Sequence, residues 1–308
     1  MKFCLIDAGI FIDKPELLDP LRAIGEVEVF NGIPAGTEEV IERAGDADVI
    51  AFGLMQFTEE MLDALPKLKV LQFIGTGMWN FVNVDYAQSR GIKVLNIDGY
   101  GSNAVAEFAT AMALALAKNI PPADRVLKED RWSIDGLMGK EMKGSTVGVV
   151  GTGSIGRLSA EKFAALGAEV IACDIYESDY LKENYKIQYK SMKEIFMEAD
   201  IVTLHMKVTE ENERIIDYKL LSLMKKDALL INVARAELVN TEDLYKALIS
   251  GNLAGAAIDV YDSEPPTARD YQLAQLKNVI ATPHIGYYTQ EANDNSIKMT
   301  VSSILAAL

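Results

Sequence analysis

The 308-residue chain is poor in several residue types, and each shortage limits what the protein can do. It has two cysteines, Cys4 and Cys173, which lie inside apolar runs and are expected to be buried, reduced thiols and not a disulfide framework. It has two histidines, His205 and His284, and no Cys/His cluster with the spacing of zinc ligands, so we predict no metal site. Any histidine chemistry must use one of these two side chains.

Positive charge is also scarce, because 30 Lys and Arg face 45 Asp and Glu and give a net charge of −15. Nucleic acids and anionic membranes bind proteins of the opposite balance, so we expect neither as a partner. Residues 1–7 reach a carboxylate too early to hold the apolar region of a signal peptide. The longest apolar helical pattern, 109–117, is too short to span a bilayer. These features predict a cytoplasmic protein.

The chain is rich in short apolar runs that alternate with helical patterns, and 49% of its residues are hydrophobic. Strands are predicted at 2–6, 26–30, 48–52, 70–74 and 93–97, and in a second series at 147–150, 169–173, 201–206, 229–234, 256–260 and 279–281. The clearest helical patterns lie at 37–44, 58–65, 102–118 and 289–308. This rhythm predicts an α/β protein with two Rossmann-like domains, each built on a doubly wound parallel sheet.

A glycine-rich turn opens the second series, where the apolar strand 147–150 runs into the sequence GTGSIG at 151–156. Each glycine has a physical reason: Gly151 permits the tight turn out of the strand, Gly153 lets the backbone approach a pyrophosphate, and Gly156 lets the following helix pack closely on the strand. The turn therefore predicts a dinucleotide-binding site.

The helix that starts at Ser154 and Ile155 presents unpaired N–H groups and a positive dipole end to the phosphates. Asp174 ends the next strand, where a carboxylate can accept hydrogen bonds from both ribose hydroxyls. The neighbouring residues 175–177 supply no cation for a 2′-phosphate. We therefore expect NAD(H) as the cofactor in preference to NADP(H).

Three later segments place polar side chains just past the carboxyl ends of predicted parallel strands. Ligands bind at these strand ends in open α/β sheets, so an arginine, a glutamate and a histidine can converge beside the nicotinamide. The segments are NVAR at 232–235, DVYDSEPP at 259–266 and TPHIG at 282–286.

With these segments, the chain resembles the D-isomer-specific 2-hydroxyacid dehydrogenases, the family of D-lactate, glycerate and D-3-phosphoglycerate dehydrogenases. The matching pieces follow one another in the family's order and cover nearly the whole chain. They are GTG at 75–77, RGIKVLN at 90–96, AVAE at 104–107, GTGSIG at 151–156 and the three segments at 232–235, 259–266 and 282–286.

The resemblance implies a discontinuous substrate-binding domain of residues 1–98 and 284–308, and an NAD-binding domain of residues 99–283, with the active site in the cleft between them. It also implies a homodimer that forms through the NAD-binding domains, using the predicted helix 102–118 and the arm around Trp132.

The resemblance assigns the catalytic roles to three side chains. His284 is the proton donor to the oxygen of a 2-keto acid, since histidine side chains ordinarily titrate near neutral pH. Glu264 is its partner, because a carboxylate that accepts the other ring N–H favours the charged imidazole. Asp262 is a rival for this role. Arg235 binds the substrate carboxylate, which suits a guanidinium fork, and polarises the carbonyl.

The remaining site residues follow from the same resemblance. The turn of Gly75, Thr76 and Gly77 adds backbone N–H donors for the substrate carboxylate. Asp259 holds the nicotinamide carboxamide, and the cofactor also meets Val233 and Ala234. His205, the second histidine, is interpreted as structural.

The sequence departs from the family pattern at Lys207, where proline is usual, and at Ala236, where glycine is common. Both departures affect loop geometry and leave the catalytic groups in place. The turn 53–56, which faces the substrate by analogy, has no Lys or Arg to hold a phosphate. Apolar and aromatic side chains are expected around the substrate, namely Met55, Trp79, Tyr287 and Tyr288.

The sequence thus favours an NAD(H)-dependent D-2-hydroxyacid dehydrogenase that reduces a small, non-phosphorylated 2-keto acid: hydroxypyruvate, glyoxylate, pyruvate or a larger apolar analogue. A dinucleotide-sensing binding protein, like the family's corepressors, is the alternative from another class, and the intact catalytic residues argue against it. A formate dehydrogenase is a third possibility, although the partner of the histidine there is typically a glutamine and here it is Glu264.

Overall fold

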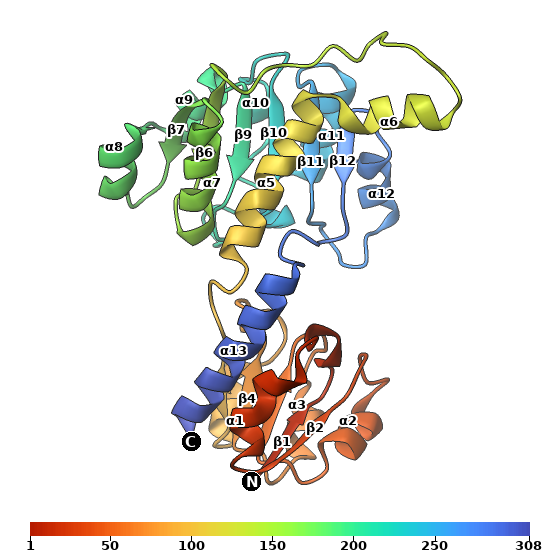
Figure 1. Cartoon of the computed structure of the whole chain (residues 1–308), viewed down its shortest axis with the longest axis vertical. Coiled ribbons are helices and arrows are strands. Elements are labelled where there is room, and N and C mark those ends of the chain that lie inside the picture. The colour runs from red at the N-terminus through yellow and green to blue at the C-terminus, as the bar shows by residue number, and fades with distance from the viewer. The chain divides into compact units, whose positions relative to one another are not determined.

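A computed structural model describes all 308 residues apart from the side chain of Asn80. The chain forms two compact units (Figure 1): unit 1 contains Met1–Gly101 and Tyr288–Leu308, and unit 2 contains Ser102–Tyr287. The boundaries predicted at 98 and 284 lie a few residues before the ones in the structure. The difference matters for His284, which the sequence placed at the start of the returning segment and the structure places in unit 2.

Unit 1 is built on a five-stranded parallel sheet in the order β2-β1-β3-β4-β5. Its strands are β1 (Lys2–Leu5), β2 (Glu26–Val29), β3 (Val49–Phe52), β4 (Val70–Phe73) and β5 (Lys93–Leu95). Its helices are α1 (Asp19–Arg22), α2 (Thr37–Ala44), α3 (Glu59–Asp63), α4 (Val84–Ser89) and α13 (Gln290–Ala307), with 3-10 turns η1 (Gly9–Phe11), η2 (Pro15–Leu18) and η3 (Met78–Asn80).

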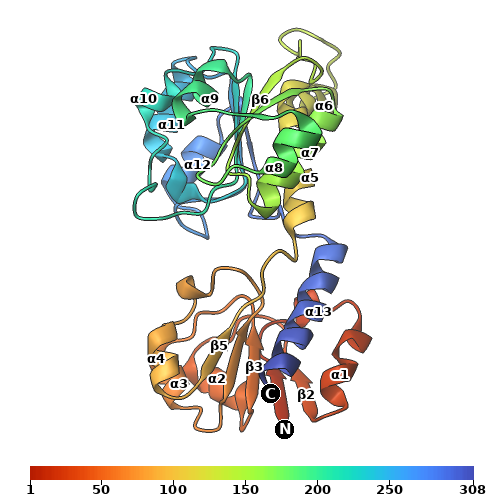
Figure 2. The ribbon, with the colours of Figure 1, turned by 90° about the vertical axis from the view of Figure 1, so that its left-hand side faces the viewer.

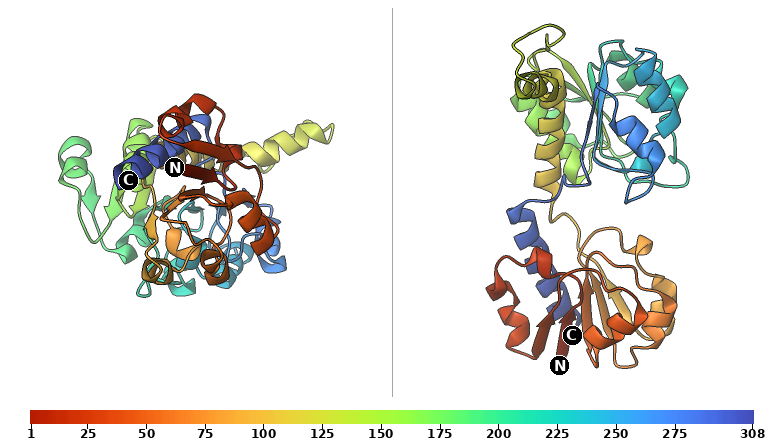
Figure 3. Two further views of the ribbon diagram at one scale, coloured as in Figure 1. Left: turned by 90° about the horizontal axis from the view of Figure 1, so that it is seen from below. Right: turned by 90° about the vertical axis from the view of Figure 1, so that its right-hand side faces the viewer.

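Helices cover both faces of the unit 1 sheet (Figure 3), which explains why β3 and β4 are buried along their whole length. On one face α2, α3 and α4 pack over a core that contains Phe52, Leu71 and Phe73. On the other face α13 packs against β4 and η2. The C-terminal segment is therefore part of the unit formed by the N-terminal residues.

Unit 2 is built on a seven-stranded parallel sheet in the order β12-β11-β10-β9-β6-β7-β8. Its strands are β6 (Thr146–Val150), β7 (Glu169–Cys173), β8 (Gln188–Tyr189), β9 (Ile201–Leu204), β10 (Leu229–Asn232), β11 (Gly255–Ile258) and β12 (Val279–Ala281). Its helices are α5 (Ser102–Ala117), α6 (Ile120–Lys128), α7 (Ser154–Ala165), α8 (Asp179–Tyr185), α9 (Met192–Glu198), α10 (Tyr218–Leu221), α11 (Thr241–Ile249) and α12 (Ala268–Ala274), with the 3-10 turn η4 (Ala236–Leu238).

The two faces of this sheet carry separate hydrophobic cores, each covered by its own helices (Figure 2). Helices α5, α7 and α8 cover the face that buries Val149, Phe163 and Leu181. Helices α9 to α12 cover the face that buries Phe196 and Leu230. The prediction of two doubly wound parallel α/β domains is confirmed.

Several elements, among them β8 and α6, were not predicted from the sequence. Strand β8 has two residues, too few for a recognisable pattern. Helix α6 begins at Ile120 and carries Pro121 and Pro122 in its first turn, where proline costs no hydrogen bond. The proline pair thus lies at the start of a new helix, directly after the left-handed residue Asn119.

The strand order places a topological switch point in each sheet, where the connections leave in opposite directions and ligands tend to bind. In unit 2 the switch point lies between β6 and β9, and in unit 1 it lies between β1 and β3. In the part of the chain that the structure describes, every helix is too short or too polar to cross a membrane.

Candidate active site and dinucleotide-binding loop

The glycine loop after β6 has the backbone geometry that its sequence predicts. Gly151 has φ +90°, and a Cβ there would lie 2.7 Å from the backbone carbon of His205. A Cβ on Gly156 would lie 1.8 Å from the carbonyl oxygen of Gly151, so this position admits no side chain. A Cβ on Gly153 would meet no atom within 4 Å. Two of the glycines are therefore needed for packing, and the third faces open space where a pyrophosphate can approach.

The N-terminus of α7 is open to a ligand. Gly153 is its N-cap and provides no side-chain cap, and the first turn, which the structure describes in full, contains no acid. Ser154 is exposed and Ile155 is half-buried. The dipole and free N–H groups of this twelve-residue helix are thus available to an anion, and the loop fits the phosphates of a dinucleotide.

Asp174 lies at the end of β7, beside this loop. Its Oδ2 accepts hydrogen bonds from the backbone N–H and the hydroxyl of Thr152, and its Oδ1 accepts one from the N–H of Tyr176 at 3.0 Å. Ile175 and Tyr176 are 88% and 81% exposed, and neither is a cation. The role of Thr152 was not predicted, because its position in the motif was read only for its glycines.

His205 follows β9 across the switch point from the loop. Its backbone N–H donates to the carbonyl of Val150 (2.7 Å), and Nε2 of its ring lies 3.0 Å from Oγ1 of Thr203. The residue reaches the surface in part, but burial of the imidazole lowers its pKa to about 3. A ring that stays neutral supports the structural interpretation of this histidine.

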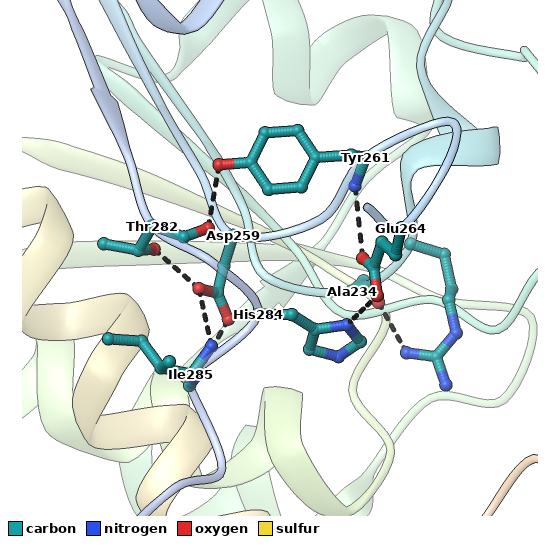
Figure 4. Close-up of polar contacts among 9 residues, drawn as sticks. Ala234, Asp259, Tyr261, Glu264, Thr282, His284 and Ile285 are labelled. Atoms are coloured by element: carbon teal, nitrogen blue, oxygen red, sulfur yellow. Dashed lines mark hydrogen bonds and ion pairs between the residues drawn. The ribbon is translucent and has the colours of Figure 1, made fainter. Parts of the chain in front are cut away.

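His284 and Glu264 form the central pair of the candidate active site, which Figure 4 shows in detail. Nδ1 of His284 lies 2.7 Å from Oε2 of Glu264. Burial by itself raises the pKa of Glu264, but the hydrogen bond and charge of His284, the N–H of Tyr261 and the charge of Arg235 together hold that pKa below its usual value. The carboxylate is therefore charged at neutral pH and accepts a hydrogen bond from the N–H at Nδ1 of His284.

Asp262, the rival partner for His284, points elsewhere. Its Oδ2 accepts a hydrogen bond of 2.7 Å from the hydroxyl of Thr241 at the start of α11. Of the two neighbouring acids, Glu264 is therefore the one in contact with the histidine.

Asp259 builds the turn that presents His284 (Figure 4). The carboxylate is 1% exposed and accepts three hydrogen bonds, from the hydroxyl of Thr282 (2.6 Å) and from the N–H groups of Ile285 (3.0 Å) and Gly286 (2.8 Å). These bonds clamp the residues on both sides of His284, which has the left-handed φ of +54°. The predicted contact of Asp259 with a carboxamide would use its remaining lone pair and stays a proposal.

Tyr261 supports the same turn from the other side, and the sequence did not reveal this role. Its hydroxyl donates to the carbonyl of Thr282 (2.8 Å). Burial raises the pKa of Tyr261 to about 12, so the hydroxyl keeps its proton and remains a donor. The ring of Tyr287 lies edge-on to the imidazole of His284, with centroids 6.1 Å apart.

Arg235 is exposed on a turn that Asn232 shapes. The side-chain amide of Asn232 donates to the carbonyl of Arg235 (2.9 Å) and accepts from the N–H of Ala234 (3.1 Å). Arg235 itself donates to the carbonyl of Ala234 (2.8 Å). Val233 is buried in the core, so only its backbone is open to a cofactor. Unit 2 thus brings Arg235, Glu264 and His284 together.

In unit 1, the turn of Gly75, Thr76 and Gly77 follows β4. The hydroxyl of Thr76 donates to Asp98 (3.3 Å), and Asn96 donates to the carbonyl of Thr76 (3.1 Å). A Cβ on Gly75 would lie 2.6 Å from the ring of Phe73, so a side chain there would displace the turn. These bonds use the hydroxyl and the carbonyl of Thr76, so the backbone N–H groups of the turn are left for a ligand.

The neighbouring turn after β3 is held by a buried carboxylate that the sequence did not reveal. Asp7 is fully buried and accepts hydrogen bonds from the N–H groups of Gly53 (2.8 Å), Leu54 (2.8 Å) and Met55 (2.7 Å). Burial raises the pKa of Asp7, although these bonds and the charge of Arg43 act in the opposite direction. Met55 is 4% exposed and belongs to the hydrophobic core, so the prediction that it lines the substrate pocket is wrong.

A hollow with a volume of about 670 Å³ opens in unit 1 beside these turns. Trp79, 68% exposed, is the most exposed aromatic side chain in its wall. Among the lining residues, Asp85 is charged and none is Lys or Arg. The hollow is lined by Gln56, Phe57, Thr58, Trp79, Phe81, Val82, Asn83, Val84 and Asp85.

The departures from the family pattern are accommodated locally. The loop that begins at Lys207 is closed by Asn212, whose side chain donates to the carbonyl of Lys207 (2.8 Å) and accepts from the N–H of Thr209 (2.7 Å). Ala236 is buried at the start of η4. Among the side chains that the structure describes, no group of three or more His, Cys, Asp and Glu is placed to hold a metal ion.

An open glycine loop with an acid at the next strand end, in the same unit as an arginine and a hydrogen-bonded Glu–His pair, defines a nicotinamide-dependent oxidoreductase. Comparison with known proteins specifies the family. Residues 110–286 match the model of the D-isomer specific 2-hydroxyacid dehydrogenase, NAD binding domain. The chain belongs to the D-isomer-specific 2-hydroxyacid dehydrogenases, and the predictions of an NAD-dependent oxidoreductase and of NAD(H) as cofactor are confirmed.

Individual relatives agree with this assignment. An aromatic 2-oxoacid reductase of Clostridium sporogenes is 37% identical over 259 residues, which cover 79% of this chain and 78% of the relative. A D-3-phosphoglycerate dehydrogenase of Methanocaldococcus jannaschii is 37% identical over 274 residues, which cover 88% of this chain and 51% of the relative, so the chain spans about half the length of that protein. The solved structure of D-2-hydroxyisocaproate dehydrogenase superposes with a TM-score of 0.86 at 26% identity, over 99% of this chain and 96% of the other.

Proposed function

We propose that the protein is a D-2-hydroxyacid dehydrogenase that works mainly as an NADH-dependent 2-oxo acid reductase. The observation that carries the proposal is the 2.7 Å contact between Nδ1 of His284 and the charged carboxylate of Glu264, with the charge of Arg235 beside it. NADH, when bound, supplies the hydride to C2 of the oxo acid. The chain must then supply one proton and hold the substrate.

His284 provides that proton. A carboxylate can only accept, so Nδ1 of the imidazole donates to Glu264 and Nε2 is the nitrogen that faces the substrate. Glu264 orients the ring through Nδ1, and the proton on Nε2 moves to the carbonyl oxygen as the alcohol forms. In the reverse direction the same nitrogen takes the proton from the hydroxyl group.

Arg235 is proposed to hold the carboxylate of the substrate, since its planar guanidinium matches a planar carboxylate. The backbone N–H groups of Gly75, Thr76 and Gly77 are proposed to bind the same carboxylate. A substrate gripped by its carboxylate presents one face of its carbonyl to the hydride, which accounts for a D-specific product.

The proposed substrates are non-phosphorylated 2-oxo acids with an apolar or aromatic side chain. The exposed ring of Trp79 offers an apolar surface at the hollow, and Asp85 in the lining would repel a phosphate. Two relatives, an aromatic 2-oxoacid reductase and D-2-hydroxyisocaproate dehydrogenase, bear names that agree with this class. The D-3-phosphoglycerate dehydrogenase among the relatives represents the competing possibility.

The test is NADH oxidation with phenylpyruvate, 2-oxoisocaproate, pyruvate, hydroxypyruvate, glyoxylate and 3-phosphohydroxypyruvate, with the His284→Ala variant in parallel. We expect turnover that is highest for the first two acids and that collapses in the variant. Faster turnover of 3-phosphohydroxypyruvate would refute the substrate class. NADH binding without turnover of any acid would refute the reductase and favour a dinucleotide-sensing protein.

We also propose a homodimer that forms through α5, α6 and the segment that follows them. This segment projects from the body of unit 2 (Figure 1) and exposes Trp132 (91%), Ile134 (84%) and Met138 (94%). Apolar side chains exposed to this degree are costly for a monomer. Light scattering is expected to give the mass of two chains, and Trp132→Glu is expected to shift it toward one.

A further inference from the structure

A chain of hydrogen bonds leads from β8 to the carboxylate of Asp174. The N–H of Ser178 donates to the hydroxyl oxygen of Tyr189 (2.9 Å), the hydroxyl of Tyr189 donates to Oγ1 of Thr152 (2.9 Å), and the hydroxyl of Thr152 donates to Oδ2 of Asp174 (3.1 Å). Ser178 is also the N-cap of α8, so one end of the chain is anchored to a helix.

The direction of every bond in this chain is fixed. A backbone N–H can only donate, so the oxygen of Tyr189 accepts from Ser178 and its single proton points at Thr152. Thr152 accepts that proton and turns its own toward Asp174. The carboxylate therefore meets a donor that cannot rotate away without breaking the whole chain.

These bonds determine which oxygen of Asp174 is free. Oδ2 accepts both the N–H and the hydroxyl of Thr152, which uses its two lone pairs. Oδ1 accepts one hydrogen bond, from the N–H of Tyr176, and keeps one lone pair for a ligand. A carboxylate fixed in this way presents one oxygen in one direction.

We infer that Thr152 and Tyr189 are positioning residues that aim the carboxylate of Asp174 at the ribose of the dinucleotide and so set the preference for NADH over NADPH. The inference rests on the proposed contact of Asp174 with the ribose, which the one free lone pair of Oδ1 limits to a single hydroxyl, where the sequence had suggested both. A fixed carboxylate gives NADH a well-directed acceptor and gives the 2′-phosphate of NADPH a negative charge that cannot move aside.

A nearby cation, Lys182, could attract the 2′-phosphate of NADPH if Asp174 were not held in place. Nζ of Lys182 lies 5.7 Å from the centroid of the Tyr189 ring, and it is paired with Glu177 (2.7 Å) and Asp179 (3.3 Å). Its charge is thus countered by two acids in the native arrangement. If Asp174 is released from its position, Lys182 is the one cation of α8 that can attract a 2′-phosphate.

The test compares Tyr189→Phe with Tyr185→Phe. The first variant keeps the ring and its contact with Lys182 but removes the hydroxyl from the chain. The control removes a hydroxyl from another tyrosine of unit 2, whose ring contacts Tyr180 (centroids 5.9 Å apart) and not Asp174. Binding of NADH and NADPH is measured by fluorescence titration, and the steady-state constants are measured with each cofactor.

Tyr189→Phe is expected to raise the Kd and KM for NADH about five- to tenfold, the worth of one ordinary hydrogen bond, with kcat at saturating NADH within about twofold of the original. The ratio of kcat/KM for NADH to that for NADPH falls by a similar factor. Tyr185→Phe leaves this ratio unchanged. Thr152→Val is expected to lower the ratio, and Thr152→Ser, which keeps the hydroxyl, to restore it.

An unchanged NADH/NADPH ratio in both Tyr189→Phe and Thr152→Val, with unchanged thermal unfolding, would overturn the inference. Equal losses in Tyr189→Phe and Tyr185→Phe would overturn it as well, since they would indicate general loosening of α8. Failure of the native protein to bind NADH would instead refute the proposed function, so the two failures can be distinguished.

Discussion

Replacement of Glu264 by glutamine tests the proton-donor mechanism directly. In the native protein Nδ1 of His284 lies 2.7 Å from the carboxylate of Glu264. The substitution keeps the size of the side chain and an oxygen that can accept a hydrogen bond from Nδ1. It removes only the negative charge. Because the pKa of Glu264 is held below its usual value of 4.5, the native carboxylate stays charged through the neutral range, and the comparison is between a charged and a neutral partner.

The size of the effect follows from the exposure of the pair. Hydrogen bonds to charged groups contribute about 1.5–3 kcal/mol. The side chains of His284 and Glu264 are 39% and 41% exposed, so solvent screens their attraction and the lower end of that range applies. A loss of about 1.4 kcal/mol of transition-state stabilisation corresponds to a rate about tenfold lower. We therefore expect kcat/KM for reduction to fall about tenfold in Glu264→Gln.

The assay is NADH oxidation with a fixed 2-oxo acid at neutral pH, in which the variant is expected to be about tenfold slower than the native enzyme. Asp262→Asn is the matched control. It removes the same charge two residues before Glu264, from a side chain that is bound to Thr241 and not to His284. An unchanged kcat/KM in Glu264→Gln, or an equal loss in the control, would refute the assigned role.

Three further predictions follow from the geometry. Gly153→Ala, whose Cβ meets no atom within 4 Å, is expected to unfold like the native protein but to raise the Kd for NADH at least about tenfold in a fluorescence titration. Gly156→Ala, whose Cβ lies 1.8 Å from a carbonyl oxygen, is expected to lose about 1–3 kcal/mol or more of stability in thermal denaturation. Trp79→Ala is expected to lower kcat/KM for phenylpyruvate about five- to tenfold and to leave that for glyoxylate within about twofold, because only the larger acid can pack against an aromatic ring. Asp259→Ala leaves three donors without their buried acceptor and is expected to lower the free energy of unfolding by about 2–4 kcal/mol in urea.

Local sequence was sufficient for the features that depend on local geometry. The turn at Gly151 and the helix contact at Gly156 each need a residue without a side chain, and this need is written into the motif itself. The strand ends were equally readable, because buried parallel strands are continuous apolar runs that stop at polar residues. Arg235, Glu264 and His284 could be named for this reason.

Features that depend on contacts between residues distant in the sequence could not be predicted. Asp7 binds a turn more than forty residues away, and nothing in its surroundings in the sequence distinguishes it from an exposed acid. The same holds for Tyr189, which reaches back to Thr152 in the glycine loop. Met55 was assigned to the substrate pocket because its turn faces the substrate by analogy, but its side chain packs into the hydrophobic core.

The two sheets make opposite use of the same topological feature. In unit 2 the switch point between β6 and β9 is kept open, since Gly153 leaves space at the start of α7 and the neighbouring His205 stays neutral. In unit 1 the corresponding point between β1 and β3 is closed, because the carboxylate of Asp7 occupies the three N–H groups that an anionic ligand would otherwise bind.

The closed switch point explains how a second Rossmann-like unit can lack a dinucleotide site. A buried carboxylate satisfies the backbone donors of the turn, and the proposed substrate site therefore lies at the adjacent strand end. There the turn of Gly75, Thr76 and Gly77 retains free backbone donors and the hollow beside Trp79 opens. One architecture thus yields a cofactor site in one unit and a candidate substrate site in the other, and the difference lies in which strand end carries the acid.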